Sequence, residues 1–440
     1  MVVSEVAVYT TMKDSGIDWI GSVPSHWAMH TLYQLVAQVK NKNKDLSEKN
    51  LLSLSYGKIK RKSIETTEGL LPESFDGYNI IEDGDVVLRL TDLQNDHTSL
   101  RVGLVTERGI ITSAYTTLRP SEECVSKYMY YLLHTFDIRK GFYGMGSGVR
   151  QGLNYDEVKE LRVILPTVDE QKAIAAYLDE QCALIDEAIA EAKVSVEELQ
   201  IWRTSIITKA VTSGVGKKAN VKDSGVLWIG NIPSEWSVVK AARIIRSTQN
   251  GITRRDLEKS QGTIVLKLKN ITPEGNIIYD DANRIDLSPS ELESYKLIPN
   301  DILFVRVNGS RTLVGKCAIF CGAPEDIAYN DHIIRVRLDN HMCLTEYFKW
   351  YMLSDSGKRE IELHTSTAAG QYTISGIGLR DIVLTLPSIS EQHQICNYLH
   401  EKMEEVERLA SEKKALISDL ESYKRSLIYE VVTGKRKVVQ

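Results

Sequence analysis

The stretch from Leu165 to Gly214 has the pattern of one long helix, and it constrains the fold more than any other part of the chain. Its start carries a capping box, because the Thr167 hydroxyl can accept the amide of Glu170 while the Glu170 side chain reaches back to the amide of Thr167. No glycine or proline interrupts the pattern before Gly214, which supplies a C-terminal stop. At about 1.5 Å per residue the helix is roughly 60 Å long, which is more than a compact domain needs.

The apolar residues of this helix follow a narrow stripe. They are spaced alternately by four and three, at Leu178, Cys182, Ile185, Ile189, Ala192, Val196 and Leu199. Such a stripe is typical of a coiled coil and requires a partner helix. A second long helix is predicted after Leu386, with a capping box at Ser388 and Glu391 and a stop at Gly434. Its predicted stripe is Val406, Leu409, Lys413, Leu416, Leu420, Tyr423 and Leu427.

The chain contains an internal repeat. Residues 14–27 read DSGIDWIGSVPSHW and residues 223–236 read DSGVLWIGNIPSEW, with nine of fourteen positions identical. The motif that opens each long helix, LPxxxEQ, also occurs twice. The first motif recurs after 209 residues and the second after 221, so the second globular block is longer by 12 residues. A repeat of this length indicates duplication of a whole domain.

Each globular block has a mixed secondary-structure pattern. Short apolar runs broken by Gly, Asp and Asn predict strands, whereas Ser126–Asp137 has helical spacing. We therefore expect an α+β fold, in which two mixed α/β globular domains are joined by two long helices packed as an antiparallel coiled coil. The expected boundaries are a globe at 1–165, a helix at 166–214, a globe at 215–386, a helix at 387–434 and a basic tail at 435–440.

Composition limits the classes of function. The net charge of −5 argues against coating of nucleic acid by charge alone, but basic runs occur in both globes, as in KIKRK at 58–62 and KLK at 267–269. Such runs are usually solvated loops. The six cysteines are scattered, and the sequence lacks a signal-peptide pattern or an 18-residue apolar run. We therefore expect a cytoplasmic protein without a membrane segment or a disulfide framework.

Catalytic signatures are nearly absent. The run GSRTLVGK at 309–316 resembles a phosphate loop, but five residues rather than four separate its glycines, and Cys317 stands where Ser or Thr would hold magnesium. A metal site built from Cys317, Cys321, His332 and Cys343 is disfavoured, because the run around the first two alternates like a strand. There is no HExxH, no GxSxG and no Pro-Pro pair of the kind found in an amino-methyltransferase pocket. We expect no catalytic residues and no metal ligands.

The duplicated WIGxxPSxW and LPxxxEQxxIxxYL motifs, with the runs GDVVLRLTDLQND and DILFVRVNGS, resemble the specificity subunit of a type I restriction-modification system. The resemblance covers nearly the whole chain. It implies that each globe is a target recognition domain that reads one half of a bipartite site in double-stranded DNA. It also implies binding to two modification (methyltransferase) subunits and to restriction (translocase and nuclease) subunits. The chain itself would need no cofactor, whereas S-adenosylmethionine, ATP and magnesium are expected on the partner subunits.

Candidate DNA-binding residues are polar or basic residues near loops and strand ends of the globes, because arginine reads guanine and Asn or Gln reads adenine through paired hydrogen bonds. In the first globe they are Arg89, Thr91, Gln94, Asn95, Arg101, Ser113, Tyr115, Arg150 and Gln151. In the second globe they are Arg254, Arg255, Lys267, Lys269, Asn270, Arg306, Asn308, Arg311 and Gln371. For any single residue, a surface position or a phosphate contact without base specificity is the simpler interpretation.

Two other functions fit the same sequence. The chain could be a non-catalytic adaptor whose coiled coil holds two protein-binding globes, with the basic runs merely solvated. It could also be a nuclease that uses scattered carboxylates such as Asp301, Glu325 and Asp331. A DNA-binding assay with and without a partner subunit separates the first alternative from DNA recognition, and magnesium-dependent nicking of DNA would support the second.

Overall fold

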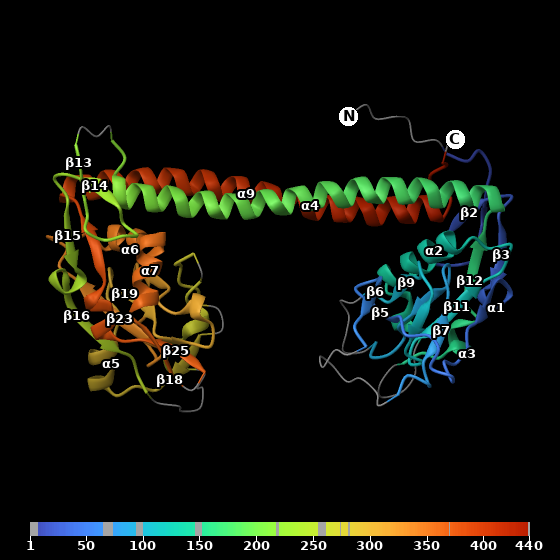
Figure 1. Ribbon diagram of the computed structural model, residues 1–440, viewed down its shortest axis with the longest axis horizontal. Helices are drawn as coiled ribbons and strands as arrows, with labels where there is room; N and C mark the ends of the chain where they lie inside the picture. The colour runs from blue at the N-terminus through green and yellow to red at the C-terminus, as the bar shows by residue number, and fades with distance from the viewer. Residues whose placement is uncertain are drawn as a thin grey trace. The chain divides into compact units, whose positions relative to one another are not determined.

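The fold is described from a computed structural model of the chain, shown in Figure 1. The described residues are 8–64, 74–93, 100–145, 152–216, 220–253, 261–272, 274–279, 282–368 and 370–438. The chain divides into two compact units. Unit 1 comprises residues 1–193 and 415–440, and unit 2 comprises residues 194–414. Each unit contains one globe together with parts of both long helices, because the two divisions fall within α4 (Val168–Ser213) and α9 (Ile389–Val432).

The globe of unit 1 is built mainly from short strands. Its elements are β1 (Met12–Asp14), β2 (Ser22–Pro24), β3 (Ala28–Thr31), α1 (Leu32–Leu35), β4 (Val36–Gln38), β5 (Leu51–Ser55), β6 (Lys58–Lys62), β7 (Asn79–Ile81), β8 (Val86–Leu88), β9 (Val102–Leu104), β10 (Gly109–Ile111), β11 (Thr116–Pro120), α2 (Ser126–Ile138), η1 (Gly141–Gly144), α3 (Tyr155–Val158) and β12 (Arg162–Leu165). The helix expected from Ser126 is α2. In Figure 1, α2 lies between the long helices and the strands.

The globe of unit 2 repeats this plan with additional elements. They are β13 (Val221–Asp223), β14 (Asn231–Pro233), β15 (Ser237–Lys240), η2 (Ala241–Arg243), β16 (Ile245–Asn250), β17 (Thr263–Leu266), η3 (Leu268–Asn270), β18 (Asn283–Ile285), α5 (Pro289–Tyr295), β19 (Ile302–Val305), β20 (Val307–Asn308), η4 (Arg311–Leu313), β21 (Cys317–Ile319), β22 (Ile327–Tyr329), β23 (Ile333–Leu338), α6 (Thr345–Leu353), α7 (Asp355–Leu363), β24 (Thr365–Ala368), β25 (Gln371–Ile374), α8 (Gly376–Asp381) and β26 (Val383–Leu386).

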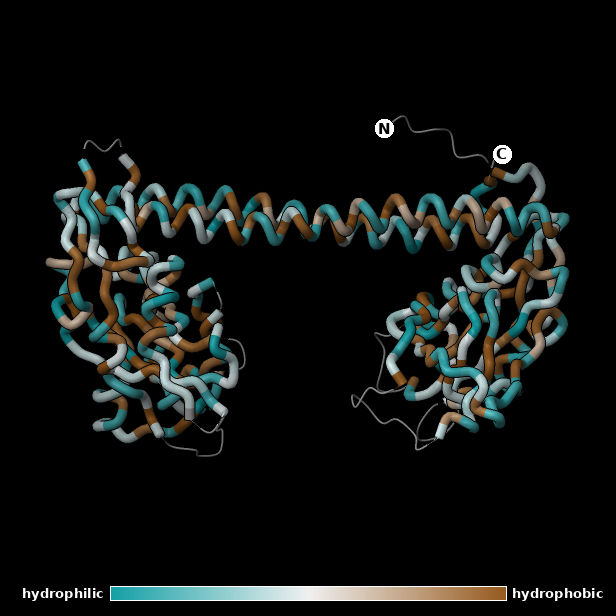
Figure 2. Tube along the Cα trace, viewed as in Figure 1, coloured by the Kyte–Doolittle hydropathy of each residue, from teal (hydrophilic) through white to brown (hydrophobic). Residues whose placement is uncertain are grey.

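The two globes share one sheet topology. The antiparallel sheet β4-β11-β8-β9 in unit 1 has its counterpart in β16-β23-β19-β21 in unit 2. A second sheet in each globe contains one parallel pair, β5 with β10 and β17 with β22. The central strands β8 and β19 are wholly buried, which explains why they read as unbroken apolar runs. Figure 2 shows hydrophobic residues concentrated inside the globes and recurring along α4 and α9.

Both capping boxes form as predicted. The Thr167 Oγ1 atom accepts the Glu170 amide at 3.3 Å, and Glu170 Oε2 accepts the Thr167 amide at 3.2 Å. Ser388 and Glu391 make the same pair of bonds at 3.3 and 3.2 Å. Helix α9 ends just before Gly434, where φ is +73° and a Cβ atom would lie 2.3 Å from Pro24 Cδ. Glycine is therefore required at this position both by the left-handed turn and by the close packing.

Within each unit, α4 and α9 pack antiparallel. In unit 1, the Lys424 Nζ atom lies 2.7 Å from Asp186 Oδ1, and Arg436, just beyond α9, bonds to Tyr177 nearer the start of α4. Rising residue numbers in α4 therefore meet falling numbers in α9. In unit 2, the last turns of α4, around Val211, share an apolar core with the first turns of α9. The helices thus meet as the alternating stripe predicts.

The predicted stripe of α9 is wrong at two positions, Leu416 and Tyr423, whereas Leu420 and Leu427 pack in the core of unit 1. Leu416 is 43% exposed and Tyr423 is 48% exposed, whereas Ile417 packs against the core of unit 1. The corresponding inner position one heptad, or two turns, further along is Lys424, whose ammonium group bonds to the Asp186 carboxylate. The apolar spacing favoured Tyr423 over the neighbouring Lys424, because a lysine is seldom found at an inner position without a charged partner.

A buried glutamine after each capping box holds the long helix to its globe. The Gln392 side chain is fully buried, its Oε1 accepts the Leu344 amide at 2.8 Å, and its Nε2 donates to Met342 O at 3.1 Å and Pro387 O at 3.0 Å. In unit 1, Gln171 makes the three matching bonds, to Val125 N, Glu123 O and Pro166 O. The repeated EQ motif therefore places one buried amide at the same junction in both units.

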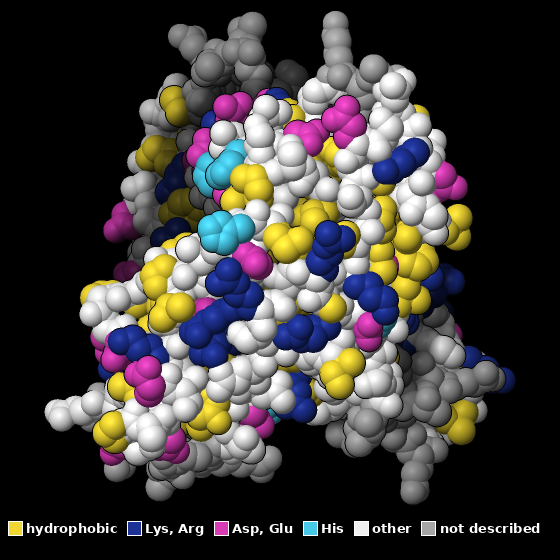
Figure 3. Space-filling view, turned by 90° about the vertical axis from the view of Figure 1, so that its left-hand side faces the viewer, with side chains coloured by type: hydrophobic (Ala, Val, Ile, Leu, Met, Phe, Trp, Pro, Cys, Tyr) yellow, Lys and Arg dark blue, Asp and Glu magenta, His cyan; other side chains and the backbone are white. Residues whose placement is uncertain are grey.

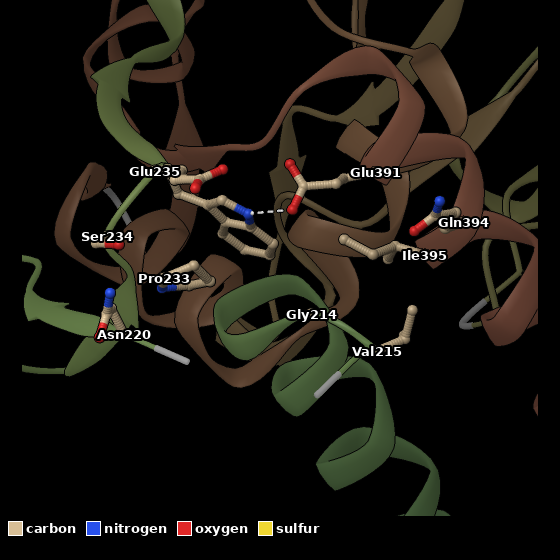
Figure 4. Close-up of a pocket in the computed structure, with 11 residues that line it drawn as sticks. Gly214, Val215, Asn220, Pro233, Ser234, Glu235, Glu391, Gln394 and Ile395 are labelled. Carbon is tan, nitrogen blue, oxygen red and sulfur yellow. Dashed lines mark hydrogen bonds between the residues drawn. The ribbon is translucent and has the colours of Figure 1, made fainter. Parts of the chain in front are cut away.

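The duplicated tryptophans complete this junction. Trp236 is 1% exposed, and its Nε1 donates to Glu391 Oε1 at 3.0 Å. Figure 4 shows this hydrogen bond as a dashed line to Glu391, beside a pocket at the start of α9. Trp27 donates to Glu170 in the same way, at 3.3 Å. Burial raises the pKa of Glu170, but hydrogen bonds from His26, Thr167 and Trp27 outweigh burial and leave the pKa below its usual value. The repeated WIGxxPSxW segment is therefore structural, because its last tryptophan bonds to the start of a long helix in each unit.

The glutamine junction gives a stability prediction. We expect Gln392→Ala to lower the free energy of unfolding of unit 2 by about 2 to 4 kcal/mol, because one donor and two acceptors at this buried site lose their partner. The matched control is Gln394→Ala, an exposed position two residues further along α9, which should change stability by less than about 0.5 kcal/mol. Urea unfolding followed by tryptophan fluorescence measures both variants, and equal midpoints would contradict the assigned role.

Among the described residues, no helix is both long enough and apolar enough to cross a membrane.

Candidate nucleic-acid interface

The end of β19 brings the chain to one polar edge of unit 2. Val305 pairs with Ile333 of β23, and the next residue, Arg306, donates its backbone N–H to His332 O at 2.8 Å. The Arg306 guanidinium Nη1 donates to Asp331 O at 3.0 Å. The arginine is therefore anchored by its neighbours while part of its side chain stays accessible to solvent.

Two other predicted residues reach the same edge, Asn308 from two residues further along and Gln371 from a distant part of the chain. The short strand β20 pairs with β25, placing Asn308 opposite Tyr372, next to the exposed Gln371. The amide of Ile374 donates to Arg306 O at 3.0 Å, which fixes β25 beside the end of β19. Arg306, Asn308 and Gln371 are thus gathered on one small surface, and these are the side-chain types that read base edges.

Lys267 and Lys269 join this edge from β17. The Asn330 amide donates to Leu266 O at 3.0 Å, so the turn η3 that carries both lysines starts beside the 330–332 loop bonded by Arg306. Lys269 is exposed and Lys267 is half-buried. Ammonium groups beside an arginine and two amides are suited to phosphate contacts at the margin of a base-reading surface.

The remaining two described candidates of unit 2 have other positions. Asn270 is fully buried, where its Oδ1 accepts the Lys267 amide at 2.8 Å and its Nδ2 donates to Ile278 O at 2.9 Å. It shapes the η3 turn, and the prediction that it contacts DNA is not supported by its position. Arg311 is exposed in η4 and lines a pocket next to α4.

Unit 1 has a corresponding edge at the end of β8. Leu88 pairs with Thr116 of β11, and Arg89 and Tyr115 are the residues next to this last pair on the two segments. Thr91 is exposed on the segment that follows. Ser113 is exposed in the turn that leads into β11, two residues before the partly buried Tyr115. The structure therefore brings together Arg89 and Tyr115, with Thr91 and Ser113 on the adjoining segments.

Arg101 is not at this surface. It is fully buried, and its guanidinium donates to Thr91 O at 2.7 Å, to Arg89 O and Asp92 O at 3.2 Å, and to the Tyr143 hydroxyl at 3.0 Å. These bonds fasten the segment after β8 to the globe. The prediction that Arg101 contacts DNA must be corrected, because its guanidinium is buried and makes these four hydrogen bonds within the fold.

Six candidates lie outside the described residues: Gln94, Asn95, Arg150, Gln151, Arg254 and Arg255.

Sequence reasoning missed two basic surfaces. The KIKRK run forms the edge strand β6, with Lys58, Lys60 and Lys62 exposed, whereas its sequence favoured a solvated loop. An edge strand lined by lysines also resists pairing with other chains, so this feature has a structural use. The Arg61 guanidinium is held by Glu107, and this hydrogen bond raises the arginine's pKa.

The second basic surface lies on the face of unit 2 that carries β15 and β16. Figure 3 shows Lys and Arg side chains gathered across this face. Its elements contribute Lys240, Arg243, Arg246 and Arg380, of which Lys240 bonds to Asp381 at 2.8 Å and Arg246 bonds to Asp339 at 3.1 Å. The carboxylates offset part of the positive charge, which makes this face less basic than its arginines suggest.

Two of the three carboxylates considered for nuclease chemistry are held by different arginines. Asp301 is 1% exposed and bonds to Arg337, while Glu325 bonds to Arg284 at 2.8 Å. Among the described residues, no group of three or more His, Cys, Asp or Glu side chains could hold a metal ion. Cys317 and Cys343 are buried in the apolar core of unit 2.

Comparison with known proteins identifies similar chains. No family model matches the sequence. The chain is 28% identical over 258 residues to the specificity subunit of the type I restriction enzyme EcoKI of Escherichia coli strain K12, covering 57% of this chain and 53% of that protein. The chain thus spans about half the length of the curated relatives it matches first.

Solved structures establish the fold. A chain from a type I restriction-modification system, studied for complex assembly and conformational transition, superposes with a TM-score of 0.70 at 13% identity, covering 93% of this chain and 98% of that chain. The HsdS subunit of Thermoanaerobacter tengcongensis gives 0.51 at 12% identity, covering 94% and 98%. The predicted fold class, two mixed globular domains joined by long helices, is confirmed. In sequence and in fold, the chain resembles the specificity subunits of type I restriction-modification systems, as its duplicated motifs predict.

Proposed function

We propose that this chain is the DNA-recognition subunit of a type I restriction-modification complex. Each globe reads one half of a bipartite target in double-stranded DNA, and the long helices scaffold the catalytic partners. In this proposal the globes within 1–165 and 215–386 are target recognition domains, the helices within 166–214 and 387–434 are the partner-binding regions, and 435–440 is a basic tail. The chain performs no catalysis.

One observation carries the proposal: the two globes share a framework but present different polar side chains at the same sheet edge. In unit 1 Arg89 and Tyr115 lie next to the last pair of β8 and β11, and in unit 2 Arg306 adjoins His332 with Asn308 and Gln371 close by. A fixed frame with variable polar residues suits two modules that read different sequences, because sequence is read by hydrogen bonds to base edges. The names of the similar proteins support the same assignment.

The partners follow from the same assignment. Two modification subunits and the restriction subunits would bind the chain, and S-adenosylmethionine, ATP and magnesium would be bound by these partners. The complex would act on DNA in the cytoplasm. The described candidates at the two edges divide into base contacts, of which Arg306, Asn308 and Gln371 are the best placed, and phosphate contacts, of which Lys267 and Lys269 are the best placed.

Isolation of the chain tests this proposal. We expect the purified chain to bind duplex DNA weakly and to transfer no methyl group from S-adenosylmethionine, because its net charge is −5 and neutralisation of phosphates dominates affinity for DNA. Adding the cognate modification subunit should restore tight, sequence-specific binding in a gel-shift assay. Methyl transfer by the chain alone, free of contaminating subunit, would overturn the non-catalytic assignment, and binding that stays unspecific with the partner present would overturn the recognition role.

A further inference from the structure

A pocket of about 420 Å³ lies within unit 2, where the loop between β20 and β21 packs against α4 and α7. The loop is the run 309–316 that resembles a phosphate loop in sequence. In the structure it contains the short helix η4 and returns directly to strand β21, so it does not open a helix as a nucleotide-hydrolysing phosphate loop does. Its sequence likeness to that motif therefore predicts no catalysis, but its side chains line a distinct cavity.

The walls of this pocket are strongly cationic. Arg203 of α4, Arg311 and Lys316 of the loop, and Lys358 of α7 all line it. Two carboxylates, Glu274 and Glu362, also line it, but Glu362 accepts a 3.0 Å hydrogen bond from Arg359, which is not among the lining residues. Four positive side chains thus share one cavity with two carboxylates. One carboxylate already has an arginine partner, and one of the cations, Lys358, lies 3.9 Å from the Asp355 carboxylate.

The floor of the pocket is apolar and closely packed. Val314, Cys317, Met352 and Ile361 line it and are each at most 6% exposed. Gly315 has a φ of +75°, and a Cβ atom there would lie 2.3 Å from Ile361 Cγ2. Glycine therefore lets the loop lie directly on α7, which forms the floor. The cavity combines a cationic wall with an apolar surface of the kind that typically lines small-molecule sites.

The positive charge of the pocket is incompletely compensated. The Nε–H of Arg203 is shielded from solvent and has no hydrogen-bond partner within the described part of the chain. Burial lowers the pKa of Lys316, the attraction of Glu274 does not cancel that effect, and Lys358 lowers the pKa further. A bound anion would pair with the positive charge of the Arg203 guanidinium and would favour the charged form of Lys316.

We propose that this pocket binds a small nucleoside phosphate, with its phosphate among Arg203, Lys316 and Lys358 and its base on the apolar floor. A phosphate alone would leave the floor uncovered, and a duplex backbone would bring no flat apolar group into the cavity. The residues that line the pocket do not include Arg306, Asn308 or Gln371, and the inference does not depend on recognition of DNA by the Arg306 edge.

Calorimetric titration of the full chain tests the proposal, with adenosine monophosphate, adenosine and inorganic phosphate as separate probes. We expect adenosine monophosphate to bind at least tenfold more tightly than either of the other two, because only it engages both the cations and the floor. Lys316→Gln and Arg203→Gln should each weaken its binding about tenfold, since hydrogen bonds to charged groups contribute strongly to affinity. Lys296→Gln, outside the pocket, should bind like the unmodified chain.

A variant at the edge of the pocket keeps the proposal testable if a change within the pocket disturbs folding. Lys358 is half-exposed, so Lys358→Glu reverses one charge without touching the core, and it should weaken binding of adenosine monophosphate more than tenfold. Thermal unfolding confirms that each variant is folded. Absence of binding, or equal binding by the unmodified chain and all three variants, overturns the proposal. Displacement of adenosine monophosphate by duplex DNA, with DNA binding weakened by Lys316→Gln, would assign the pocket to the DNA backbone and overturn it as well.

Discussion

Replacing Asp301 by alanine is expected to lower the stability of the globe of unit 2 while leaving that of unit 1 unchanged. The Asp301 carboxylate is 1% exposed and receives two hydrogen bonds from Arg337, at 2.6 and 3.0 Å, and one from the Ile298 amide at 2.9 Å. Removing the carboxylate leaves the partly buried guanidinium of Arg337 and the amide of Ile298 without this hydrogen-bond partner. We expect Asp301→Ala to cost about 3 kcal/mol, the low end for broken buried pairs, because the Arg337 side chain remains one-third exposed.

Unit 1 repeats this arrangement and supplies an internal comparison. Asp85, also 1% exposed, receives two bonds from Arg119, at 2.7 and 2.8 Å, and one from the Glu82 amide at 2.9 Å. Hydrogen–deuterium exchange of peptides from the two central sheets measures the effect in each globe separately. Asp301→Ala should speed exchange in β19 and β23, and Asp85→Ala should speed it in β8 and β11.

Two controls sharpen this test. Asp326 pairs with Lys296 on the surface, where both side chains are 44% exposed, so Asp326→Ala should cost less than about 1 kcal/mol. Replacing Asp301 and Arg337 together by Leu and Met should recover much of the stability, because no charge is then left unpaired. Unchanged exchange in β19 and β23 after Asp301→Ala would contradict the role of the buried pair.

Sequence patterns anticipated the parts of the fold that depend on local or repeated signals. The capping boxes at Thr167 and Ser388 form as predicted, and Trp27 and Trp236 are structural. The hydrogen bonds from Trp27 to Glu170 and from Trp236 to Glu391 were not predictable, because each glutamate is more than 140 residues away in the sequence. Such pairings are fixed by the tertiary fold and leave no local signal.

The candidate site was predicted less well, for a physical reason. Arginine is usually exposed, so Arg101 was assigned to the DNA surface, yet backbone carbonyls and Tyr143 satisfy its donors in the interior. Asn270 departs from its prediction for the same reason: its side chain is buried and makes its hydrogen bonds within the globe. By contrast, Arg306 and Gln371 share one edge because β20 pairs with β25, a long-range contact that no spacing in the sequence encodes. The sequence identified suitable residue types, and the fold decided which of them lie together.

Exchange of one globe is expected to change one half of the DNA target. The block from Ser237 to Thr385 is suited to exchange, because its ends lie in paired strands, with Val238 opposite Thr385. Its contacts to the long helices also recur in the other repeat. The Tyr347 hydroxyl donates to Val211 O at the end of α4 at 3.3 Å, as the Tyr128 hydroxyl does to Val432 O at the end of α9. A matching block from a relative should therefore dock on the same helices.

The reciprocal exchange is the matched control. In unit 1 the corresponding block runs from Ala28 to Ile164, and its ends likewise lie in paired strands, β3 and β12. Replacing it should alter the other half-site and leave intact the half-site read by unit 2. Loss of all methylation in both exchanges would indicate misfolding, which the exchange rates of β8 and β19 would reveal.

The most direct test of the two-globe account is the methylated motif of a host that carries the cognate modification subunits with the Ser237–Thr385 exchange. Sequencing of methylated bases across the genome reads both half-sites at once. We predict a bipartite motif in which one half matches the unmodified chain and the other half matches the donor of the block. A motif in which both halves change, or in which neither changes although the complex methylates DNA, would contradict the assignment of one half-site to each globe.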